Sequence, residues 1–475
     1  MTLTEHRAAG GLESLLPAGV VVTDPDVTAA YARDASSLTA SAVPRAVLMP
    51  RTTEEVSQCM RAMSALGIPV VPRGAGSGLS GAANASEGCV VLSLHRMNAI
   101  LEVNAADRLA VAQPGVVTAD LRAAARAAGL FYPPDPGSVE TCTLGGNAAT
   151  NAGGMCCVKY GVTGDFVIGL EVVLADGRVM RTGRRTVKGV AGYDLTSLFV
   201  GSEGTLGVIS EITVQLVPEP RTAHTLVASF GALADAGGAV ASVMQAGLTL
   251  SIMEILDRTT VQAVDQLARM GLGEDVGALL LMQSDAPDAA DVLGLVEDIC
   301  SECDAVDIAR SSDPAEAALL LEARRLALPA LERLGDWLLD DVAVPRSKIV
   351  ELIAAVEAIS QRLGVVIGVF GHAGDGNMHP TVVYDAADSA STAVARIAFD
   401  AITQKALELG GTITGEHGVG KLKQGWLLRE LDEASQCVQT SIKAALDPRG
   451  ILNPGAVFAS PAGRGGDEDA VSNRD

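Results

Sequence analysis

The glycine-rich stretch that decides the fold lies near the N-terminus and reads Pro72-Arg73-Gly74-Ala75-Gly76-Ser77-Gly78-Leu79-Ser80-Gly81. Short apolar runs at 68–71 and 89–94 flank it and are predicted to be strands. The Gly76-x-Gly78-x-x-Gly81 spacing matches the dinucleotide fingerprint. That fingerprint requires a helix at its third glycine, whereas small polar residues and a strand follow here. A glycine-rich loop between strands can still hold phosphates, because backbone N–H groups converge without obstruction by side chains.

The segments before this loop predict a β-α-β unit. Residues 46–50 are apolar and are expected to form a strand. Thr52 and Glu55 have the spacing of a capping box, and apolar residues at helical intervals follow until Gly67. Residues 1–40 carry scattered proline and glycine, which predicts a short helical lead-in before the first domain.

Two further stretches of small residues follow, at 133–154 and 198–209. Between them, apolar runs around Asp176-Gly177 predict a hairpin at 166–182. Small residues let a backbone lie flat against a planar ligand, so both stretches are candidate cofactor contacts. Pro218 and Pro220 indicate a domain boundary near 220. Strands are also predicted at 100–103, 109–112 and 212–217, and a helix at 117–128.

From 221 to 455 strands and long helices alternate, which predicts a second domain. Asp313 and Pro314 suit an N-cap and a first helical residue, and this helix is expected to carry Arg324 and Arg325 to near Gly335. Residues 456–475 are polar, glycine-rich and acidic, and are expected to be a disordered tail. Further predicted elements are helices at 347–364 and 392–409 and strands at 365–370 and 412–414.

Two motifs at the ends of predicted strands contain three of the six histidines in the chain. His372 and His379 flank a Gly-Asp-Gly turn, and Glu416 and His417 follow the strand at 412–414. Two imidazoles and one carboxylate, with an open position, are a common set of ligands for a catalytic divalent metal. His417 is then free to move protons near neutral pH. The alternative is that these are ordinary histidines of glycine-rich loops.

Composition limits the classes of protein open to this chain. At 475 residues, two or three domains are expected, and 48% apolar residues supply large cores. A formal charge of −22 and 3% aromatic residues argue against binding of nucleic acid or anionic membranes. No apolar run is long enough to span a membrane, and no secretory signal is visible. The eight cysteines are scattered, with Cys300 and Cys303 expected to be buried or half-buried on a helix, so a reduced, cytoplasmic protein is expected.

In order and spacing, the glycine-rich stretches and histidine motifs resemble those of a known family, the FAD-linked 2-hydroxy acid dehydrogenases. This family includes the glycolate oxidase, D-lactate dehydrogenase and D-2-hydroxyglutarate dehydrogenase types and has a flavin fold like that of vanillyl-alcohol oxidase. The resemblance covers nearly all of residues 40–455. It implies an α+β protein, with an FAD-binding domain of two subdomains at 41–220. It also implies an α+β substrate and metal cap with an antiparallel sheet at 221–455, whose last segment returns to the flavin domain.

The resemblance also implies how FAD is held. The loop at 72–81 would hold the pyrophosphate, and the other two stretches would wrap the rest of the cofactor. Some relatives attach FAD covalently through a histidine whose place is taken here by Ser77, so a non-covalent FAD is expected. The family's closing motif commonly ends in lysine, but Ala456 takes that place here. The implied FAD contacts are Arg73, Gly74, Ala75, Gly76, Ser77, Gly78, Ser80, Pro136, Gly137, Ser138, Gly145, Gly146, Asn147, Thr150, Ala152, Gly154, Glu203, Gly207, Ile209 and Asn453.

The implied metal ligands are His372, His379 and Glu416, with zinc as the first candidate metal and manganese as the second. By the same resemblance, His417 would be the catalytic base and Arg324 the partner of the substrate carboxylate. Arg324 could also be an ordinary arginine on a helix surface. Asn377 would orient the substrate or a ligand, or would only form the turn.

The expected reaction is oxidation of a small 2-hydroxy acid to the 2-oxo acid, with hydride transfer to FAD and electrons passed to an acceptor other than NAD. Leu339 stands where 2-hydroxyglutarate enzymes have a lysine, which favours glycolate or D-lactate over D-2-hydroxyglutarate. A metal hydrolase would leave the glycine-rich stretches unexplained, and a non-catalytic flavin subunit would be expected to lack the metal residues. The expected partners are the substrate, an unidentified electron acceptor or partner subunit, and a second copy in a homodimer.

Overall fold

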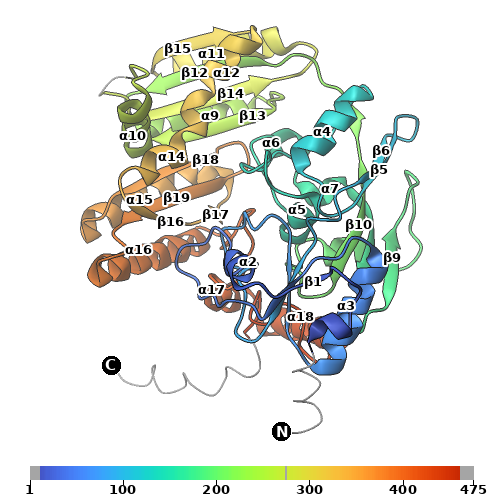
Figure 1. Ribbon diagram of the computed structural model, residues 1–475. Helices are drawn as coiled ribbons and strands as arrows, with labels where there is room; N and C mark the ends of the chain where they lie inside the picture. Colours follow the sequence, from blue (N-terminus) through green and yellow to red (C-terminus); the bar gives the residue numbers. More distant parts are fainter. Residues whose placement is uncertain (1–10, 273–274, 460–475) are drawn as a thin grey trace.

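Two α+β halves lie side by side in the computed structural model, which describes residues 11–272 and 275–459 (Figure 1). The N-terminal half carries two main sheets, and the C-terminal half is built on one eight-stranded sheet. This is the α+β architecture that was predicted. The boundaries at 40, 220 and 455 remain predictions, and from residue 460 onward the expected tail lies outside the described residues.

The first sheet contains the predicted β-α-β unit, with the strand order β1-β2-β4-β3. Its strands are β1 (Val21–Val22), β2 (Ala46–Leu48), β3 (Val70–Arg73) and β4 (Val90–Ser93). Helix α3 (Thr53–Leu66) begins where Thr52 Oγ1 accepts a hydrogen bond from Glu55 N–H, and it ends at Gly67, as predicted. The lead-in is not only helical, because β1 pairs with β2 beside the short η1 (Leu12–Ser14) and α2 (Pro25–Ala30). The glycine-rich loop leaves the sheet directly after β3.

The second sheet is antiparallel and has the order β5-β6-β10-β8-β9. Its strands are β5 (Ile100–Asn104), β6 (Leu109–Ala112), β8 (Val167–Val173), β9 (Val179–Gly183) and β10 (Val208–Gln215). The pairing of β8 with β9 confirms the predicted hairpin. A small ribbon pairs β7 (Leu130–Phe131) with β11 (Val217–Pro218). The helices between β6 and β10 are α4 (Thr118–Ala127), α5 (Leu144–Thr150), α6 (Cys157–Tyr160), α7 (Thr163–Phe166) and α8 (Leu195–Phe199).

The sheet of the C-terminal half is antiparallel, has the order β15-β12-β14-β13-β18-β19-β16, and pairs β17 with β19. Its strands are β12 (His224–Phe230), β13 (Ile252–Asp257), β14 (Ala278–Ser284), β15 (Ala305–Ser311), β16 (Asp336–Leu339), β17 (Val342–Ala343), β18 (Ile367–His372) and β19 (Asn377–Tyr384). Apolar side chains of one set of helices form the main core on this sheet: α9 (Leu233–Gln245), α11 (Ala289–Glu302), α15 (Ile349–Leu363) and α16 (Ser389–Glu408). A second core is formed with α10 (Arg258–Ala268) and the short helices that follow β15.

Three stretches of this half differ from the sequence prediction. The helix expected from Asp313 to near Gly335 is three short helices, α12 (Pro314–Leu320), α13 (Glu322–Arg325) and α14 (Ala327–Glu332). A proline is tolerated only in the first turn of a helix, so Pro329 requires a helix to begin just before it. The strand predicted at 412–414 is reduced to one bridge between Thr412 and Ala343. Strand β19, which carries His379, was not predicted.

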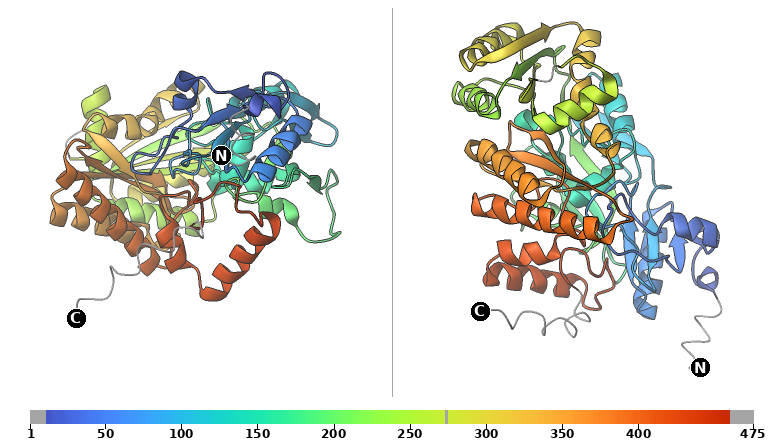
Figure 2. Two further views of the ribbon diagram at one scale, coloured as in Figure 1. Left: turned by 60° about the horizontal axis from the view of Figure 1, so that its bottom comes forward. Right: turned by 90° about the vertical axis from the view of Figure 1, so that its left-hand side faces the viewer.

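The last described segment returns to the N-terminal half through α17 (Gln424–Glu430) and α18 (Glu433–Leu446) (Figure 2). Ile442 of α18 packs against the core of the second sheet, and Leu452 forms a parallel bridge with Val70 of β3. The two halves are therefore held together beside the glycine-rich loop. Within residues 11–272 and 275–459, no helix is both long enough and apolar enough to cross a membrane.

Candidate active site

A cavity of about 1340 Å³ runs between the two halves. All three glycine-rich stretches line it from the N-terminal half, and the histidine motifs line it from the other half. This volume is above the roughly 300–1,000 Å³ of ordinary ligand pockets, which suits a large cofactor together with a small substrate. Every FAD contact implied by the sequence lines the cavity except Asn453, whose Nδ2 donates instead to the carbonyls of Ala82 and Glu203.

Glycine-rich stretches form much of the wall on the side of the N-terminal half, with Arg122, Arg126 and Phe131 among the other lining residues. In the described part of the chain, no N–H group of residues 75–80 donates to a protein acceptor. Converging free N–H groups beside a cavity are a cradle for phosphate oxygens, so the loop fits a pyrophosphate. The start of α5 packs closely on the chain behind it, because a Cβ at Gly145 would lie 2.5 Å from Pro114 Cβ. Helix formation in this stretch, capped by Thr143, was not predicted.

Glu203 joins this wall to the C-terminal segment. Its two carboxylate oxygens accept hydrogen bonds of 2.8 Å from the N–H groups of Val419 and Gly420. Burial raises the pKa of Glu203 to about 7, although these two donors act in the opposite direction. The loop that carries His417 is thus tied to the cofactor wall three residues after Glu416.

The facing wall is formed by side chains of the β18–β19 hairpin. His372 is the last residue of β18 and His379 is the third of β19, so both imidazoles point to the same side of the hairpin. Their Nε2 atoms lie 3.3 Å apart. Glu416 Oε1 lies 3.3 Å from Nε2 of His372 and 3.4 Å from Nε2 of His379. The three predicted ligands therefore meet at one point.

The spacing of these three atoms fits a divalent metal. Ligand atoms about 2.0–2.1 Å from a tetrahedral zinc lie roughly 3.3–3.4 Å apart. Burial lowers the pKa of His379 well below its usual range, and the charge of His372 adds to this effect, so the His379 imidazole is neutral. Burial alone would raise the pKa of Glu416, but the hydrogen bond from His372 and the nearby imidazoles lower it to about 2. A neutral imidazole and an ionised carboxylate are the forms that bind metals.

Glu254 supports His372 from behind and was missed by the sequence analysis. It lies on β13 directly opposite His372 and is fully buried. Its Oε1 is 2.6 Å from His372 Nδ1, and its Oε2 accepts a 2.5 Å hydrogen bond from Arg324 Nε. Burial would lower the pKa of His372, but Glu254 and Glu416 hold it well above its usual range. A single carboxylate within the apolar run Ile252–Leu256 was the sequence signal that could have found it.

Arg324 lies on the cavity wall, with its guanidinium 4.8 Å from the ring centre of Phe370. Because Glu254 holds Nε, the arginine is fixed beside the histidine cluster and is not a free surface residue. Phe370 is buried and belongs to the same apolar cluster as the buried Leu339, and both residues also line the cavity.

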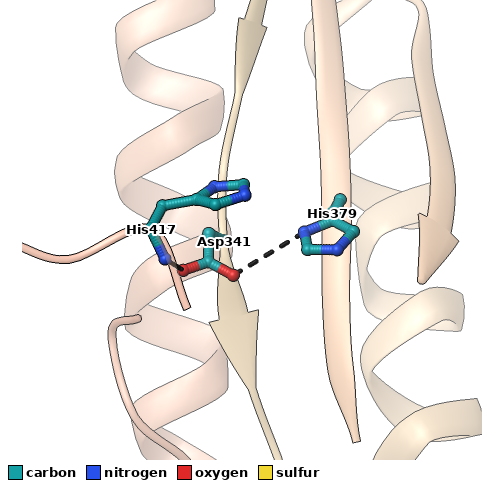
Figure 3. Close-up of side chains that lie close together, drawn as sticks. All are labelled: Asp341, His379 and His417. Carbon is teal, nitrogen blue, oxygen red and sulfur yellow. Dashed lines mark hydrogen bonds and ion pairs between the residues drawn. The ribbon is translucent and has the colours of Figure 1, made fainter. Parts of the chain in front are cut away.

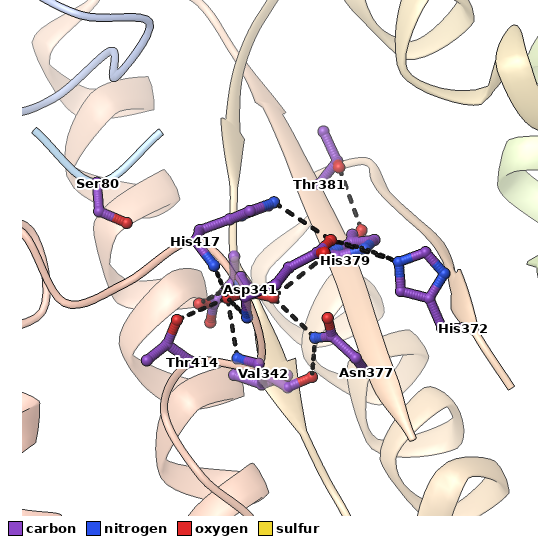
Figure 4. Close-up of polar contacts among 12 residues, drawn as sticks. Ser80, Asp341, Val342, His372, Asn377, His379, Thr381, Thr414 and His417 are labelled. Atoms are coloured by element: carbon purple, nitrogen blue, oxygen red, sulfur yellow. Dashed lines mark hydrogen bonds and ion pairs between the residues drawn. The ribbon is translucent and has the colours of Figure 1, made fainter. Parts of the chain in front are cut away.

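His417 and Asp341 complete the cluster (Figure 3). The His417 ring stacks on that of His379 with ring centres 5.2 Å apart, and its Nε2 lies 3.7 Å from Glu416 Oε1. The segment at 414–417 is an irregular loop wrapped around the Asp341 carboxylate, and it begins at the last residue of the strand predicted at 412–414 (Figure 4). Asn377 does not line the cavity, because its Nδ2 donates to Asp341 Oδ1 and to the Val342 carbonyl.

A glycine-lined cofactor cavity with a histidine and carboxylate cluster on its far wall defines a flavin-dependent oxidoreductase. The chain belongs to the FAD-linked oxidase family: residues 219–457 match the model described as FAD linked oxidases, C-terminal domain, and residues 44–183 match the FAD binding domain. FAD is therefore the cofactor that this fold holds.

Relatives of known name agree with this assignment. Glycolate oxidase subunit GlcD of Bacillus subtilis is 43% identical, covering 94% of this chain and 93% of its own length. D-lactate dehydrogenase of Anaerostipes hadrus is 33% identical, covering 94% and 96%. The solved structure of p-cresol methylhydroxylase with substrate bound aligns with a TM-score of 0.81 at 18% identity, covering 97% of this chain and 98% of that one. The last likeness shows that the fold is shared with vanillyl-alcohol-oxidase-like enzymes.

Proposed function

We propose that this protein oxidises a small 2-hydroxy monocarboxylate, glycolate or D-lactate, to the 2-oxo acid with the help of a divalent metal. The observation that carries the proposal is the meeting of His372 Nε2, His379 Nε2 and Glu416 Oε1 within 3.4 Å on the wall of the FAD cavity. The names of the relatives, glycolate oxidase subunit and D-lactate dehydrogenase, point to the same substrate class.

The residues divide the work as follows. When bound, FAD would supply the hydride acceptor, and a metal held by His372, His379 and Glu416 would supply the positive charge that lowers the pKa of the substrate hydroxyl. His417, stacked beside this cluster, takes the hydroxyl proton as general base. Arg324 donates hydrogen bonds to the substrate carboxylate and is held in place by Glu254.

The wall beside Arg324 favours a small monocarboxylate. Leu339 and Phe370 are both buried there, so a second carboxylate at Leu339 would lose water and gain no partner. D-2-hydroxyglutarate is therefore the weaker candidate. Ser77 lines the cavity in place of the tethering histidine, which supports a non-covalent FAD.

A spectrum and a substrate screen test this proposal together. Purified protein should show flavin absorbance, and acid should release all of the flavin from the chain. A chelator should remove activity without releasing FAD. Turnover with a dye acceptor should be highest with glycolate or D-lactate and low with L-lactate and D-2-hydroxyglutarate. Full activity in a metal-free preparation would refute the role of the metal. A clear preference for the dicarboxylate would refute the monocarboxylate substrate.

A further inference from the structure

Asp341 is a buried carboxylate for which the proposed reaction has no role. It lies between β16 and β17, and only 1% of the residue is exposed. Its Oδ2 accepts four hydrogen bonds from one loop: 2.7 Å from Thr414 Oγ1, and 2.9, 3.0 and 2.9 Å from the N–H groups of Gly415, Glu416 and His417 (Figure 4). The loop that brings Glu416 and His417 to the cavity is therefore centred on one oxygen atom.

The other oxygen of Asp341 faces the metal-binding hairpin. Oδ1 accepts a 2.7 Å hydrogen bond from Asn377 Nδ2 and lies 3.6 Å from His379 Nδ1 (Figure 3). His379 Nδ1 is buried and has no hydrogen-bond partner within the described ranges. A buried N–H without an acceptor is costly, and Asp341 Oδ1 is the carboxylate oxygen beside it. A shift of a few tenths of an ångström would close this gap to hydrogen-bond distance.

Asp341, His379 and His417 also have the spacing of a possible metal site of their own. The hydrogen bonds argue against that use. Five donors already occupy the two oxygens of Asp341, and the remaining direction of Oδ1 faces His379 Nδ1. Asp341 is thus built to accept hydrogen bonds and not to bind an ion.

We propose that Asp341 is a positioning residue that sets the tautomer of His379 and fixes the loop of Glu416 and His417, so that one carboxylate aligns the metal ligands with the base. An acceptor at Nδ1 keeps the imidazole proton there and leaves the Nε2 lone pair for a metal. His372 has the same arrangement with Glu254. The inference rests on the proposed function for the presence of a metal.

The substitution Asp341→Asn separates this role from simple packing. The amide has nearly the same shape, but only one of its two atoms can accept. If its oxygen faces the four loop donors, its NH2 group faces His379 Nδ1, which must then accept and carry its proton on Nε2. The opposite orientation points the NH2 group at four donors. Either way the site is impaired without loss of side-chain volume.

Asp340→Asn is the matched control. Asp340 is the preceding residue and is fully buried. Its carboxylate contacts Lys423 Nζ at 2.7 Å, Thr403 Oγ1 at 2.8 Å and the Asp341 N–H at 2.8 Å, but no histidine. Loss of this charge leaves Lys423 buried without its counterion, so the variant should lower Tm at least as much as Asp341→Asn. Its effect on metal affinity should nevertheless be small.

The experiment measures the zinc Kd of the FAD-loaded proteins by competition with a chelator, together with Tm and the flavin spectrum. Asp341→Asn is expected to weaken zinc about 10–100-fold, as is usual for the hydrogen-bond partner of a metal ligand, with FAD retained. An unchanged Kd, or an equal loss in Asp340→Asn, would overturn the inference. If the unaltered protein binds no zinc, the proposed function fails first, and the two failures are therefore distinguishable.

Two further measurements keep the inference testable if Asp341→Asn does not fold. Nitrogen-15 NMR of histidine-labelled, zinc-loaded protein should show the His379 proton on Nδ1, and a proton on Nε2 would contradict the tautomer. Thr414→Val removes one loop bond but keeps the carboxylate. It should slow flavin reduction and weaken zinc binding less than Asp341→Asn does, and unaltered flavin reduction would show that Asp341 does not act through the loop.

Discussion

The two walls of the cavity are built by different means. The wall of the N-terminal half is formed largely by three glycine-rich stretches, each a continuous piece of chain, with a few side chains such as Arg122 and Phe131 beside them. The histidine cluster on the wall of the C-terminal half is held by side chains from five separate places, around residues 254, 324, 341, 372–379 and 416–417. A backbone wall binds through local conformation, whereas a side-chain wall depends on contacts between distant segments. Substitutions should therefore damage one wall and spare the other.

The largest expected effect is that of His379→Ala on the side-chain wall. The change removes one of the three ligand atoms and leaves the glycine-rich stretches untouched. Because a metal ion contributes several kcal/mol to transition-state stabilisation, turnover should fall by about 10³-fold or more. Metal analysis should show loss of the ion while the flavin spectrum is kept. Loss of FAD together with the metal would show that the two walls are not independent.

His417→Ala and Glu416→Gln test separately the two proposed functions of the same wall, proton abstraction and metal binding. His417→Ala should keep the metal and FAD but slow flavin reduction about 10²–10⁴-fold, the usual contribution of a general base. Glu416→Gln should instead weaken metal binding, because an amide oxygen is a poorer ligand than a carboxylate. Stopped-flow reduction and metal analysis of both variants provide the comparison. The reverse pattern would mean that the two roles are exchanged.

Gly145→Ala tests the backbone wall. The new Cβ would lie 2.5 Å from Pro114 Cβ and 2.9 Å from the Pro114 carbonyl oxygen, so the start of α5 must move. Overpacking of this kind costs about 1–3 kcal/mol and should weaken FAD binding about 10-fold or more, with the metal retained. Gly425→Ala is the control, since its Cβ would meet nothing within 4 Å. Fluorescence titration of the apoprotein with FAD measures both, and equal affinities would contradict the prediction.

The smallest expected effect lies outside both walls. Thr52→Ala removes the oxygen that caps α3 and should lower the free energy of unfolding by about 1 kcal/mol. FAD affinity, metal affinity and turnover should be unchanged. Urea unfolding followed by circular dichroism gives the stability. A change in the cofactor or metal affinity would show that α3 also shapes the cavity.

The difference between the two walls also explains how much of the site could be predicted from the sequence. The glycine-rich stretches were visible because glycine content is a local property, and the histidine motifs because few histidines occur elsewhere. Glu254 and Asp341 were not assigned roles, because neither is near the histidines in the chain. Glu254 meets His372 only through the register of β13 against β18, and Asp341 meets His417 across 76 positions of sequence.

The sequence by itself determined the α+β class, the helix caps and the hairpin of the second sheet, and it indicated candidate residues for FAD and metal binding. These depend on short-range patterns of apolar residues, glycine and capping side chains. Only the tertiary structure decided that Asn377 supports Asp341 and that Arg324 is anchored by Glu254. It also decided that the strand predicted at 412–414 is reduced to one bridge, followed by a loop at 414–417. The physical reason is that a buried carboxylate takes its hydrogen-bond donors from whichever segments the packing brings to it.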